Sequence, residues 1–472
     1  MLKPISLSFI ALLVAPLGCD KSDAGTGDDT EASAVDSTAP TADDTAATGG
    51  PGTGTTDDTA TTGGPGATDD TSTTDTSAAP TVTWHADVAP MLQTYCGRCH
   101  YDDGLGTGDF SDYTTAAAMA SIMLTQIDAD QMPPAASEPE CRDYHGSEFM
   151  FLPEEARDTL ATWIDEGTPE GDPADAVEVE VIDELLADPD LEVLIGAAYT
   201  PTFSDASNPG NEYRCFVLDP GLTEDAYITA MQPIIDNRQM AHHVVLYTRN
   251  SRALPADYAD ADGFSCINGE EFSYIGAMVA GWAPGSLPIE LEEWGGMKLD
   301  AGEQLIMQMH YYDPGDLEEV DDHSGYAFRF ADSVETEIQL EALGVYTFNI
   351  PADDPDYSAS GSTLVPFNRR ATIYSIFPHM HVLGSGFRMW SEDSEGAETC
   401  LVSSESYDFE NQQTYLFREP LVIEGGATLR YECTWNNSTS NPDLIHDPPQ
   451  STRYGERTDE EMCFFFALMS YE

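Results

Sequence analysis

The sequence predicts a multidomain chain in which a small all-α domain is followed by two all-β domains, each an antiparallel sandwich. Three observations predict this organisation. At 472 residues the chain is too long for one ordinary core. Apolar residues recur at helical spacing between residues 82 and 166. From about residue 176, short β-branched and aromatic runs alternate with Gly, Pro and Asp turns, which is typical of strands.

The N-terminus has the pattern of an export signal, with a Lys at position 3, the apolar run 5–14 and a Pro-Leu-Gly-Cys motif ending at Cys19. The apolar run is too short to span a bilayer. Cys19 resembles the lipidation site of bacterial lipoproteins, and cleavage of an unlipidated signal peptide nearby is the alternative. We expect residues 1–18 to be removed and the protein to be exported and lipid-anchored to a bacterial membrane, on its periplasmic or cell-surface side.

Residues 19–80 are expected to form a disordered acidic linker rich in Thr, Gly, Asp and Pro. Large apolar side chains are almost absent there, so the segment cannot bury enough surface to offset its conformational entropy. The whole chain has 18 Lys and Arg against 85 Asp and Glu, a formal net charge of −67 at pH 7. Such a charge repels nucleic acid and anionic lipids. We therefore expect no nucleic-acid partner, and membrane contact only through the N-terminal lipid.

Residues 81–175 contain the first motif with a specific chemistry, Cys96-Gly-Arg-Cys99-His100, placed after a predicted helix. In a Cys-x-x-Cys-His motif the two thiols bond to haem and the His ligates its iron. A redox dithiol and half of a zinc site are the alternatives, which the His directly after the second Cys disfavours. We expect a cytochrome c-like domain with one haem c. Its other helices are predicted from Asp112 through an Ala- and Met-rich run, and from Pro153 to Glu166.

A second axial ligand of the haem is expected some tens of residues after His100. Met132, in the run Gln-Met-Pro-Pro, offers a thioether on a rigid loop, and this run is similar to one in small bacterial cytochromes c. His145 is the alternative ligand. A thioether ligand raises the reduction potential, as expected for an electron carrier.

Five of the ten His fall in three clusters within the region of predicted strands. His242 and His243 open one strand and His310 lies in another. Adjacent strand residues point to opposite faces, so His242 and His243 can bind one metal only with a local bend or through different ring nitrogens. His379 and His381 are two residues apart, which places both on one face of a strand. Taken singly, each cluster also suits ordinary core or surface histidines.

Together with the C-terminal run Asp459-Glu-Glu-Met-Cys463, these clusters resemble the copper type II, ascorbate-dependent monooxygenases. The resemblance covers about residues 180–472 through the patterns His-His, Gln-x-His-Tyr, His-x-His-x-x-Gly and Asp-Glu-x-Met-Cys, in that order. We expect two jelly-roll-like sandwiches, at residues 176–352 and 353–472. The resemblance implies one copper held by His242, His243 and His310, and a second held by His379, His381 and Met462. Imidazoles suit copper, and a thioether selects Cu(I) over zinc.

The resemblance also implies an activity, the hydroxylation of an sp³ C–H with O₂ at the copper of His379, His381 and Met462. The three-His copper supplies the second electron. Ascorbate is the reductant in the family. Because a haem motif stands upstream here, we expect the cytochrome domain to supply or relay the electrons, with ascorbate or a redox partner protein as their source. A non-catalytic copper and haem electron-transfer lipoprotein, and a binding module with structural His clusters, are the alternatives.

The expected substrate follows from two departures from the family. Peptide-specific members hold a substrate carboxylate with an Arg two residues before the His-x-His pair, where this chain has Phe377. An Asn two residues after the ligand Met is replaced by Phe464, and Phe465 and Phe466 follow. We expect an apolar pocket and a small aromatic or aliphatic substrate rather than a glycine-extended peptide.

Six cysteines remain besides Cys19 and the two in the haem motif. In an oxidising compartment they could form three disulfides. The resemblance implies the pairs Cys215–Cys266 in the first sandwich and Cys433–Cys463 in the second. The second bond would hold Met462 beside its copper. Cys141 and Cys400 have no counterpart in the family.

Overall fold

The computed structural model describes most of the chain after residue 79, namely residues 80–102, 104, 106–179, 185–204, 210–259, 262–266, 273–313, 321–409, 411–455 and 459–472. The predicted signal peptide, the lipidation site Cys19 and nearly all of the linker lie outside the described residues. Within the described ranges, none of the helices has the length and apolar character needed to cross a membrane.

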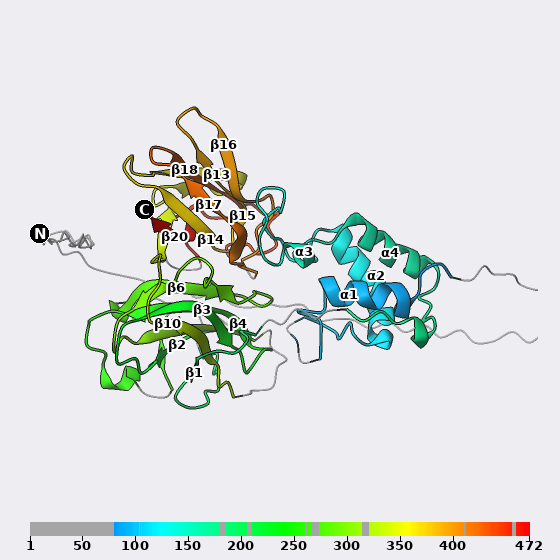
Figure 1. Ribbon diagram of the computed structural model, residues 1–472. Helices are drawn as coiled ribbons and strands as arrows, with labels where there is room; N and C mark the ends of the chain where they lie inside the picture. The colour runs from blue at the N-terminus through cyan, green and yellow to red at the C-terminus, as the bar shows by residue number, and fades with distance from the viewer. Residues whose placement is uncertain are drawn as a thin grey trace, which may run out of the picture. The chain divides into compact units, whose positions relative to one another are not determined.

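The first part of the described chain is helical, as predicted (Figure 1). Its apolar faces share one core, in which Leu92, Leu160 and Trp163 are fully buried and against which Cys96 packs. Asp112 caps the N-terminus of the helix Tyr113–Asp128 by accepting a hydrogen bond from the backbone N–H of Thr115. The helical elements are η1 (Trp84–Val88), α1 (Ala89–Tyr95), α2 (Tyr113–Asp128), α3 (Ser147–Met150), α4 (Glu154–Asp165) and η2 (Pro173–Asp175).

Residues 191–331 form a sandwich of two antiparallel sheets. One sheet has the order β1-β10-β3-β7, with β8 also paired to β3, and the other has the order β5-β2-β9-β4-β6. Side chains from both sheets share one core, for example Met231 from the first and Met307 from the second. The elements are β1 (Leu191–Leu194), β2 (Asn211–Leu218), β3 (Ala226–Ile234), β4 (Ala241–Arg249), η3 (Ala256–Ala259), β5 (Phe264–Ser265), β6 (Ile275–Trp282), β7 (Ile289–Glu290), β8 (Met297–Leu299), β9 (Leu305–Tyr312) and β10 (Gly325–Ala331).

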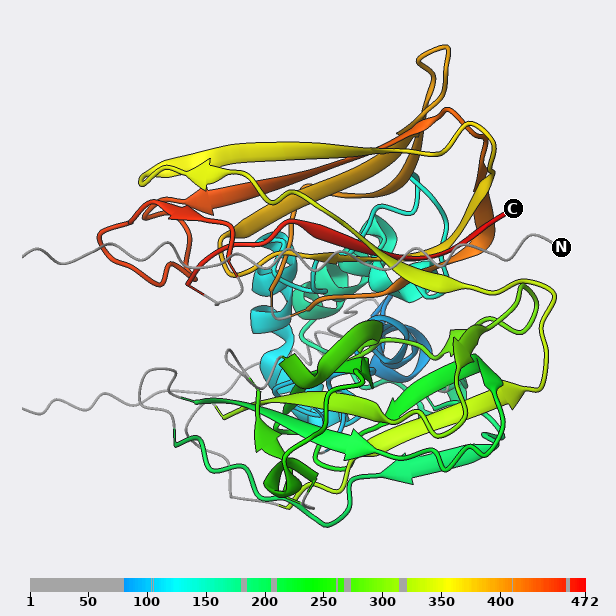
Figure 2. The same ribbon diagram turned by 90° about the vertical axis from the view of Figure 1, so that its left-hand side faces the viewer.

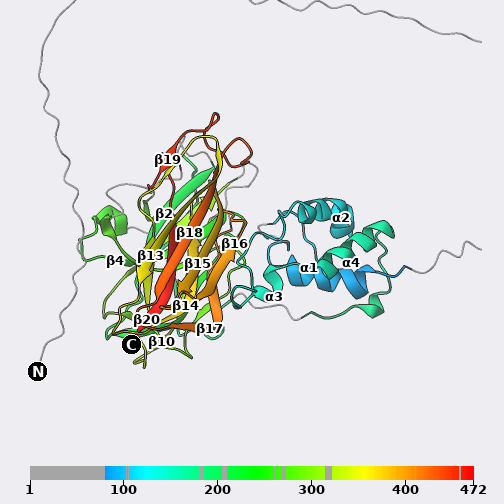
Figure 3. The same ribbon diagram turned by 90° about the horizontal axis from the view of Figure 1, so that it is seen from above.

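A second antiparallel sandwich follows, and its sheets lie as two layers, coloured yellow to red, in Figure 2. One sheet has the order β11-β20-β14-β17. The other has the order β13-β18-β15-β16, which Figure 3 shows side by side. The strands are β11 (Gln339–Gly344), β12 (Asn349–Ile350), β13 (Asp354–Leu364), β14 (Ala371–His379), β15 (Gly384–Glu392), β16 (Glu398–Ser404), β17 (Tyr415–Ile423), β18 (Thr428–Asn437), β19 (Thr452–Arg453) and β20 (Phe464–Tyr471). The predicted all-β character of this region is confirmed.

The strand pairing places the boundary between the sandwiches earlier than the predicted 176–352 and 353–472. β11 pairs with β20 from Gln339↔Met469 to Gly344↔Phe464, so it belongs to the second sandwich. β10 is the last strand of the first, which puts the boundary within residues 332–338. The prediction was wrong here because residue alternation identifies a strand but not the sheet that it joins.

Three disulfides join distant parts of the described chain. Cys215–Cys266 and Cys433–Cys463 are the pairs that the family resemblance implies. The third, Cys141–Cys400, attaches the segment after α2 to the second sandwich across 259 residues. Backbone hydrogen bonds accompany it, from Glu138 N–H to the Ser403 carbonyl at 2.8 Å and from His145 N–H to the Leu416 carbonyl at 2.9 Å.

Replacing Cys141 and Cys400 together by Ser is expected to lower the free energy of unfolding by roughly 2–5 kcal/mol, because the bond restricts the unfolded chain. Both cysteines are half-buried, so a Ser fits either position. Urea unfolding followed by tryptophan fluorescence measures the change. An unfolding midpoint equal to that of the wild-type protein would contradict the expectation.

Candidate metal sites

The first candidate site consists of His242 and His243 on β4 and His310 on the neighbouring strand β9. Nδ1 of His243 lies 3.1 Å from Nδ1 of His242 and 3.3 Å from Nδ1 of His310. One ring nitrogen from each residue fits within a set whose members are all less than 4.8 Å apart. The three nitrogens converge closely enough to bind one cation once each presents its lone pair, so the cluster suits a metal.

A β-bulge brings the adjacent His242 and His243 to the same site. The pairing of β4 with β9 shifts register between Ala241 and His243. The extra residue of a bulge bends the strand and redirects a side chain. This is the local bend that the sequence analysis requires of two neighbouring His ligands.

Asn211 determines which nitrogen of His310 is available. Nε2 of His310 donates a hydrogen bond to Oδ1 of Asn211 at 2.7 Å, which leaves the lone pair on Nδ1. Burial lowers the pKa of His310 and of His243 well below the usual 6.5, and the neighbouring imidazoles lower both further. Both rings are therefore neutral at neutral pH, which is the form that binds metals.

Replacing Asn211 by Leu removes this acceptor and is expected to lower the copper affinity of the three-His site by roughly 10–100-fold. Competition with a chromophoric copper chelator measures the affinity. Asn349→Leu is the matched control, because Asn349 is exposed on β12. Equal affinities in the two variants would show that Asn211 does not orient His310.

The second candidate site consists of His379, His381 and Met462, which line one pocket of about 370 Å³ together with His243. The ring centroids of His379 and His381 are 5.3 Å apart, with the ring planes at 81°. The sequence predicted both rings on one face of a strand. Instead β14 ends at His379, so His381 lies beyond the strand. Strand pairing stops there because the backbone N–H of Met380 donates instead to the Tyr407 hydroxyl, which donates back to the Met380 carbonyl.

Each imidazole of this pair has a hydrogen-bond acceptor at its Nδ1. Nδ1 of His379 donates to Oε1 of Gln412 at 2.6 Å, and Nδ1 of His381 donates to the carbonyl of Glu460 at 3.0 Å. Both rings therefore keep the lone pair on Nε2. Burial lowers the pKa of His379, so this ring is neutral at neutral pH.

Glu461 is fully buried and joins the two segments that carry His381 and Met462. Its carboxylate accepts hydrogen bonds from the backbone N–H groups of His381 at 3.0 Å, Leu383 at 2.8 Å and Met462 at 3.3 Å. The indole of Trp435 donates a fourth, at 2.9 Å. Burial raises the pKa of Glu461 to about 7, against the opposing effect of these donors.

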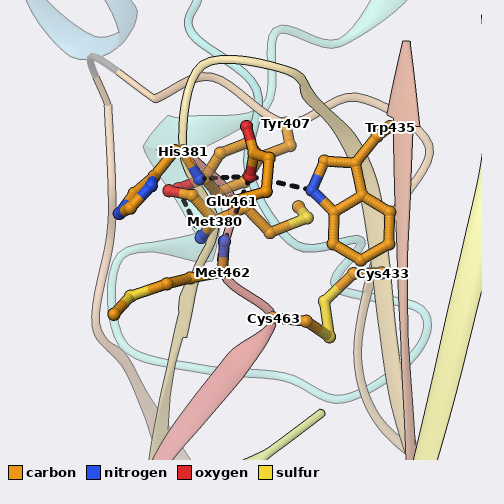
Figure 4. The surroundings of a disulfide bond; sticks show 8 residues. All are labelled: Met380, His381, Tyr407, Cys433, Trp435, Glu461, Met462 and Cys463. Atoms are coloured by element: carbon orange, nitrogen blue, oxygen red, sulfur yellow. Dashed lines mark hydrogen bonds between the residues drawn. A yellow bond between two sulfur atoms is a disulfide. The ribbon is translucent and has the colours of Figure 1, made fainter. Parts of the chain in front are cut away.

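Figure 4 shows His381 and Met462 extending to the same side of the Glu461 carboxylate, while the Cys433–Cys463 disulfide lies on another side. Glu461 is the variable position of the Asp-Glu-x-Met-Cys pattern, which assigns it no role. Its position next to Met462 was the only signal, because its partners lie up to 80 residues away.

Phe409 packs against one His of each candidate site. Its ring is edge-on to His243, at 6.4 Å between centroids, and to His381, at 6.1 Å. No sequence pattern pointed to Phe409. One aromatic ring therefore contacts both clusters.

The pocket lining is aromatic and neutral. Phe377, Phe464 and Phe466 line it, as expected, whereas Phe465 is fully buried in the core of the second sandwich. Among the described residues that line it, there is no Asp, Glu, Lys or Arg. An apolar pocket without a carboxylate clamp is what Phe377 and Phe464 predict.

Cys96, Cys99 and His100 lie together after α1. Cys96 and Cys99 form no disulfide, although they are three residues apart. Burial, reinforced by Cys99, raises the pKa of the Cys96 thiol to about 12. Nδ1 of His100 donates to the carbonyl of Thr107 at 3.0 Å, and the ring stacks on Phe110 with centroids 4.2 Å apart. The ring therefore keeps its lone pair on Nε2, while burial lowers its pKa.

The two candidates for the second haem ligand lie in different surroundings. Met132 follows α2 directly and is 41% exposed, which is high for an apolar side chain. His145 is exposed, and its backbone is hydrogen-bonded to β17 through Leu416. Its pKa is lowered by burial and by Arg418.

Family models match both sandwiches. Residues 204–318 match the N-terminal domain, and residues 358–472 the C-terminal domain, of copper type II ascorbate-dependent monooxygenases. The chain is 24% identical over 274 residues to DBH-like monooxygenase protein 2 of Mus musculus, covering 54% of this chain and 42% of the relative. It is 24% identical over 284 residues to peptidyl-glycine alpha-amidating monooxygenase A of Xenopus laevis, covering 57% of this chain and 27% of the relative.

The chain thus spans less than half the length of these two relatives. A solved structure of an allantoicase aligns with 48% of this chain and 78% of its own at 12% identity, with a TM-score of 0.15. The two family matches contain all six residues of the two candidate sites. Both sandwiches, with the candidate sites that they carry, are therefore similar to the two domains of the copper type II ascorbate-dependent monooxygenases, a family of oxidoreductases.

Proposed function

We propose that the chain is a copper-dependent monooxygenase that hydroxylates an sp³ C–H bond of a small apolar or aromatic substrate. The observation that carries this proposal is the arrangement of two metal-ligand clusters around one neutral aromatic pocket. In the net reaction, the C–H bond, O₂, two electrons and two protons give the C–OH group and water. The proposed copper ligands are His242, His243 and His310 at one site and His379, His381 and Met462 at the other.

The donor sets fit copper. His310, His379 and His381 each donate a hydrogen bond from one ring nitrogen. The other ring nitrogen keeps its lone pair for a metal. A thioether from Met462 favours Cu(I) over zinc, which prefers Cys, His and carboxylate. When bound, copper supplies the one-electron chemistry that O₂ requires. The chain's own residues hold the ligands in place, and the aromatic walls give the pocket an apolar surface.

The pocket supports the substrate class. A volume of about 370 Å³ suits a small molecule. A substrate carboxylate would lose its hydration there without gaining a charged partner, which is costly. Phe377 and Phe466 offer aromatic faces instead, at 6.1 Å between ring centroids.

We also propose that residues 81–175 form a c-type cytochrome domain that supplies or relays the electrons. Cys96 and Cys99 would bind haem covalently, with His100 and Met132 as axial ligands. The lone pair on Nε2 of His100 and the exposure of Met132 support this assignment. Export, a lipid anchor at Cys19 and a tether over residues 19–80 complete the proposal.

Quantifying copper and haem in the full chain, together with substrate-dependent O₂ uptake, tests the proposal. We expect two copper ions and one haem per chain, and hydroxylation of alkyl-substituted aromatic compounds. A chain that binds no copper would overturn the proposal. Turnover of a glycine-extended peptide at the same rate would overturn the substrate class. Copper and haem without substrate-dependent O₂ uptake would favour a non-catalytic electron-transfer protein.

A further inference from the structure

The loop that carries the haem motif contacts the first sandwich next to the three-His site. Nη1 of Arg238 donates a hydrogen bond to the hydroxyl of Tyr101 at 3.0 Å. The guanidinium carbon of Arg238 lies 6.0 Å from the centroid of the Tyr101 ring. Tyr101 directly follows His100, the proposed iron ligand, and Arg238 is four residues before His242. One side-chain contact therefore joins the haem loop to the turn that enters β4.

The turn that carries Arg238 is held rigidly to the strands of the site. Asn237 is buried, and its side-chain oxygen accepts from the backbone N–H of Met240 at 3.3 Å. The backbone N–H of Asn237 donates to the fully buried carboxylate of Asp322 at 3.1 Å. Asp322 also accepts from the hydroxyl of Tyr311, which follows His310, at 2.7 Å. A side chain that docks on Arg238 is thereby positioned relative to both ligand strands.

A second contact from the haem motif reaches the neighbourhood of the other site. Arg98 lies between the two motif cysteines, and a Cβ on Gly285 would come within 3.0 Å of its Nη2. The residues flanking Gly285 both bond to Gln413, through the Ser286 hydroxyl at 2.9 Å and the Pro284 carbonyl at 3.2 Å. Gln413 follows Gln412, the partner of His379. Gly285 has a φ of 83°, a left-handed conformation that favours glycine, and its missing Cβ leaves room for the end of the Arg98 side chain.

From these contacts we infer that the Tyr101–Arg238 pair is the docking contact through which the haem passes electrons to the three-His copper. The inference rests on the proposed function, because it requires both metals. With haem held by Cys96, Cys99 and His100 and copper held by His242, His243 and His310, each transfer would move one electron from ferrous haem to Cu(II), giving ferric haem and Cu(I). Ascorbate or another one-electron donor then reduces the haem again. Tyr101 and Arg238 are positioning residues, since neither is a ligand.

Arg238 is one of few cationic residues in a strongly acidic chain. Only 18 of the 472 residues are Lys or Arg. A cation at this point pairs with a phenol hydroxyl, and a hydrogen bond with a charged donor is stronger than a neutral one. Such a bond holds the loop in one position without a covalent link.

The test uses the full chain loaded with copper and haem, with Tyr101→Phe and Arg238→Met as the variants. Tyr101→Phe keeps the ring and removes the hydroxyl, and Arg238→Met keeps the length and removes the donor. Arg252→Met is the matched control, because Arg252 lies over Tyr274 in the same sandwich, 4.8 Å from its ring centroid. The haem is reduced by a light pulse while the copper is oxidised and O₂ is absent. Reoxidation is then followed by the haem absorbance.

We expect both docking variants to slow haem reoxidation at least about tenfold, because loss of a hydrogen bond to a charged group lowers the population of the docked loop by about that factor. Arg252→Met should match the wild type. A second readout needs no metal: amide hydrogen exchange of residues 97–102 should be faster in both docking variants of the metal-free chain. In the copper-loaded chain without haem, where ascorbate can only reduce the copper directly, hydroxylation should be the same in the variants and the wild type.

Each other outcome contradicts the inference. Equal reoxidation rates in all proteins would overturn the docking role while leaving the proposed monooxygenase intact. Equal slowing in the Arg252→Met control would show that the effect is not specific to the contact. A chain without haem or copper would overturn the proposed function, and the docking role with it.

Discussion

Replacing His310 by Ala is expected to reduce the bound copper from two ions per chain to one and to slow hydroxylation by more than about 100-fold. Loss of a residue that only hydrogen-bonds to a metal ligand costs up to about 100-fold, and loss of the ligand itself should cost more. His310 supplies one of three converging nitrogens, and its Nδ1 lies 3.3 Å from that of His243. Without it, the two adjacent His of β4 cannot complete a three-coordinate site. Elemental analysis and copper electron paramagnetic resonance measure the loss, and product formation measures the rate.

His323→Ala is the control for this substitution. His323 lies in the same sandwich, is exposed, and bonds through Nε2 to the carbonyl of Ile195 at 3.0 Å. It is expected to keep both copper ions and full activity. If His310→Ala retained two copper ions per chain, the three-His assignment would be wrong.

Much of the fold is local in origin, and these parts could be predicted. The helix predicted from Pro153 to Glu166 is found as α4 (Glu154–Asp165), because a Pro opens it and a Gly follows its end. Short β-branched and aromatic runs predicted strands after about residue 176, and β4 (Ala241–Arg249) and β9 (Leu305–Tyr312) are two of them. In contrast, the sheet that β11 joins depends on β20, more than 100 residues later, and no local pattern encodes this pairing.

The residues of the candidate sites also fall into those that the sequence predicts and those that it does not. The ligand residues could be named because their types and order match a family. The groups that orient them could not, because they come from distant positions: Asn211 is 99 residues from His310 and Gln412 is 33 residues from His379. The bend at His242 and His243 was foreseen as a steric requirement, since strand geometry separates neighbouring side chains. The end of β14 at His379 depends on Tyr407, which sequence spacing does not reveal.

Replacing Glu461 by Ala is expected to lower the free energy of unfolding by about 3–5 kcal/mol. The substitution leaves four buried hydrogen-bond donors without an acceptor, and each costs about 1–3 kcal/mol. Relaxation of the surrounding structure offsets part of the total. The donors are the backbone N–H groups of His381, Leu383 and Met462 and the indole of Trp435. Chemical unfolding measures the loss. Glu424→Ala is the control, because Glu424 is exposed after β17, and it should change stability by less than about 0.5 kcal/mol.

Stability alone does not distinguish a role at the metal site from a role in the core, but the copper content does. Glu461 bonds to the backbones of both His381 and Met462, so its loss should release the second copper while the three-His site keeps its own. Glu461→Gln sharpens the comparison, because the amide keeps the volume but turns an N–H₂ group toward backbone donors on one side. It should weaken copper binding at the second site with a smaller loss of stability. Retention of both copper ions in the folded Glu461→Ala protein would show that the disulfide Cys433–Cys463 alone suffices to position Met462.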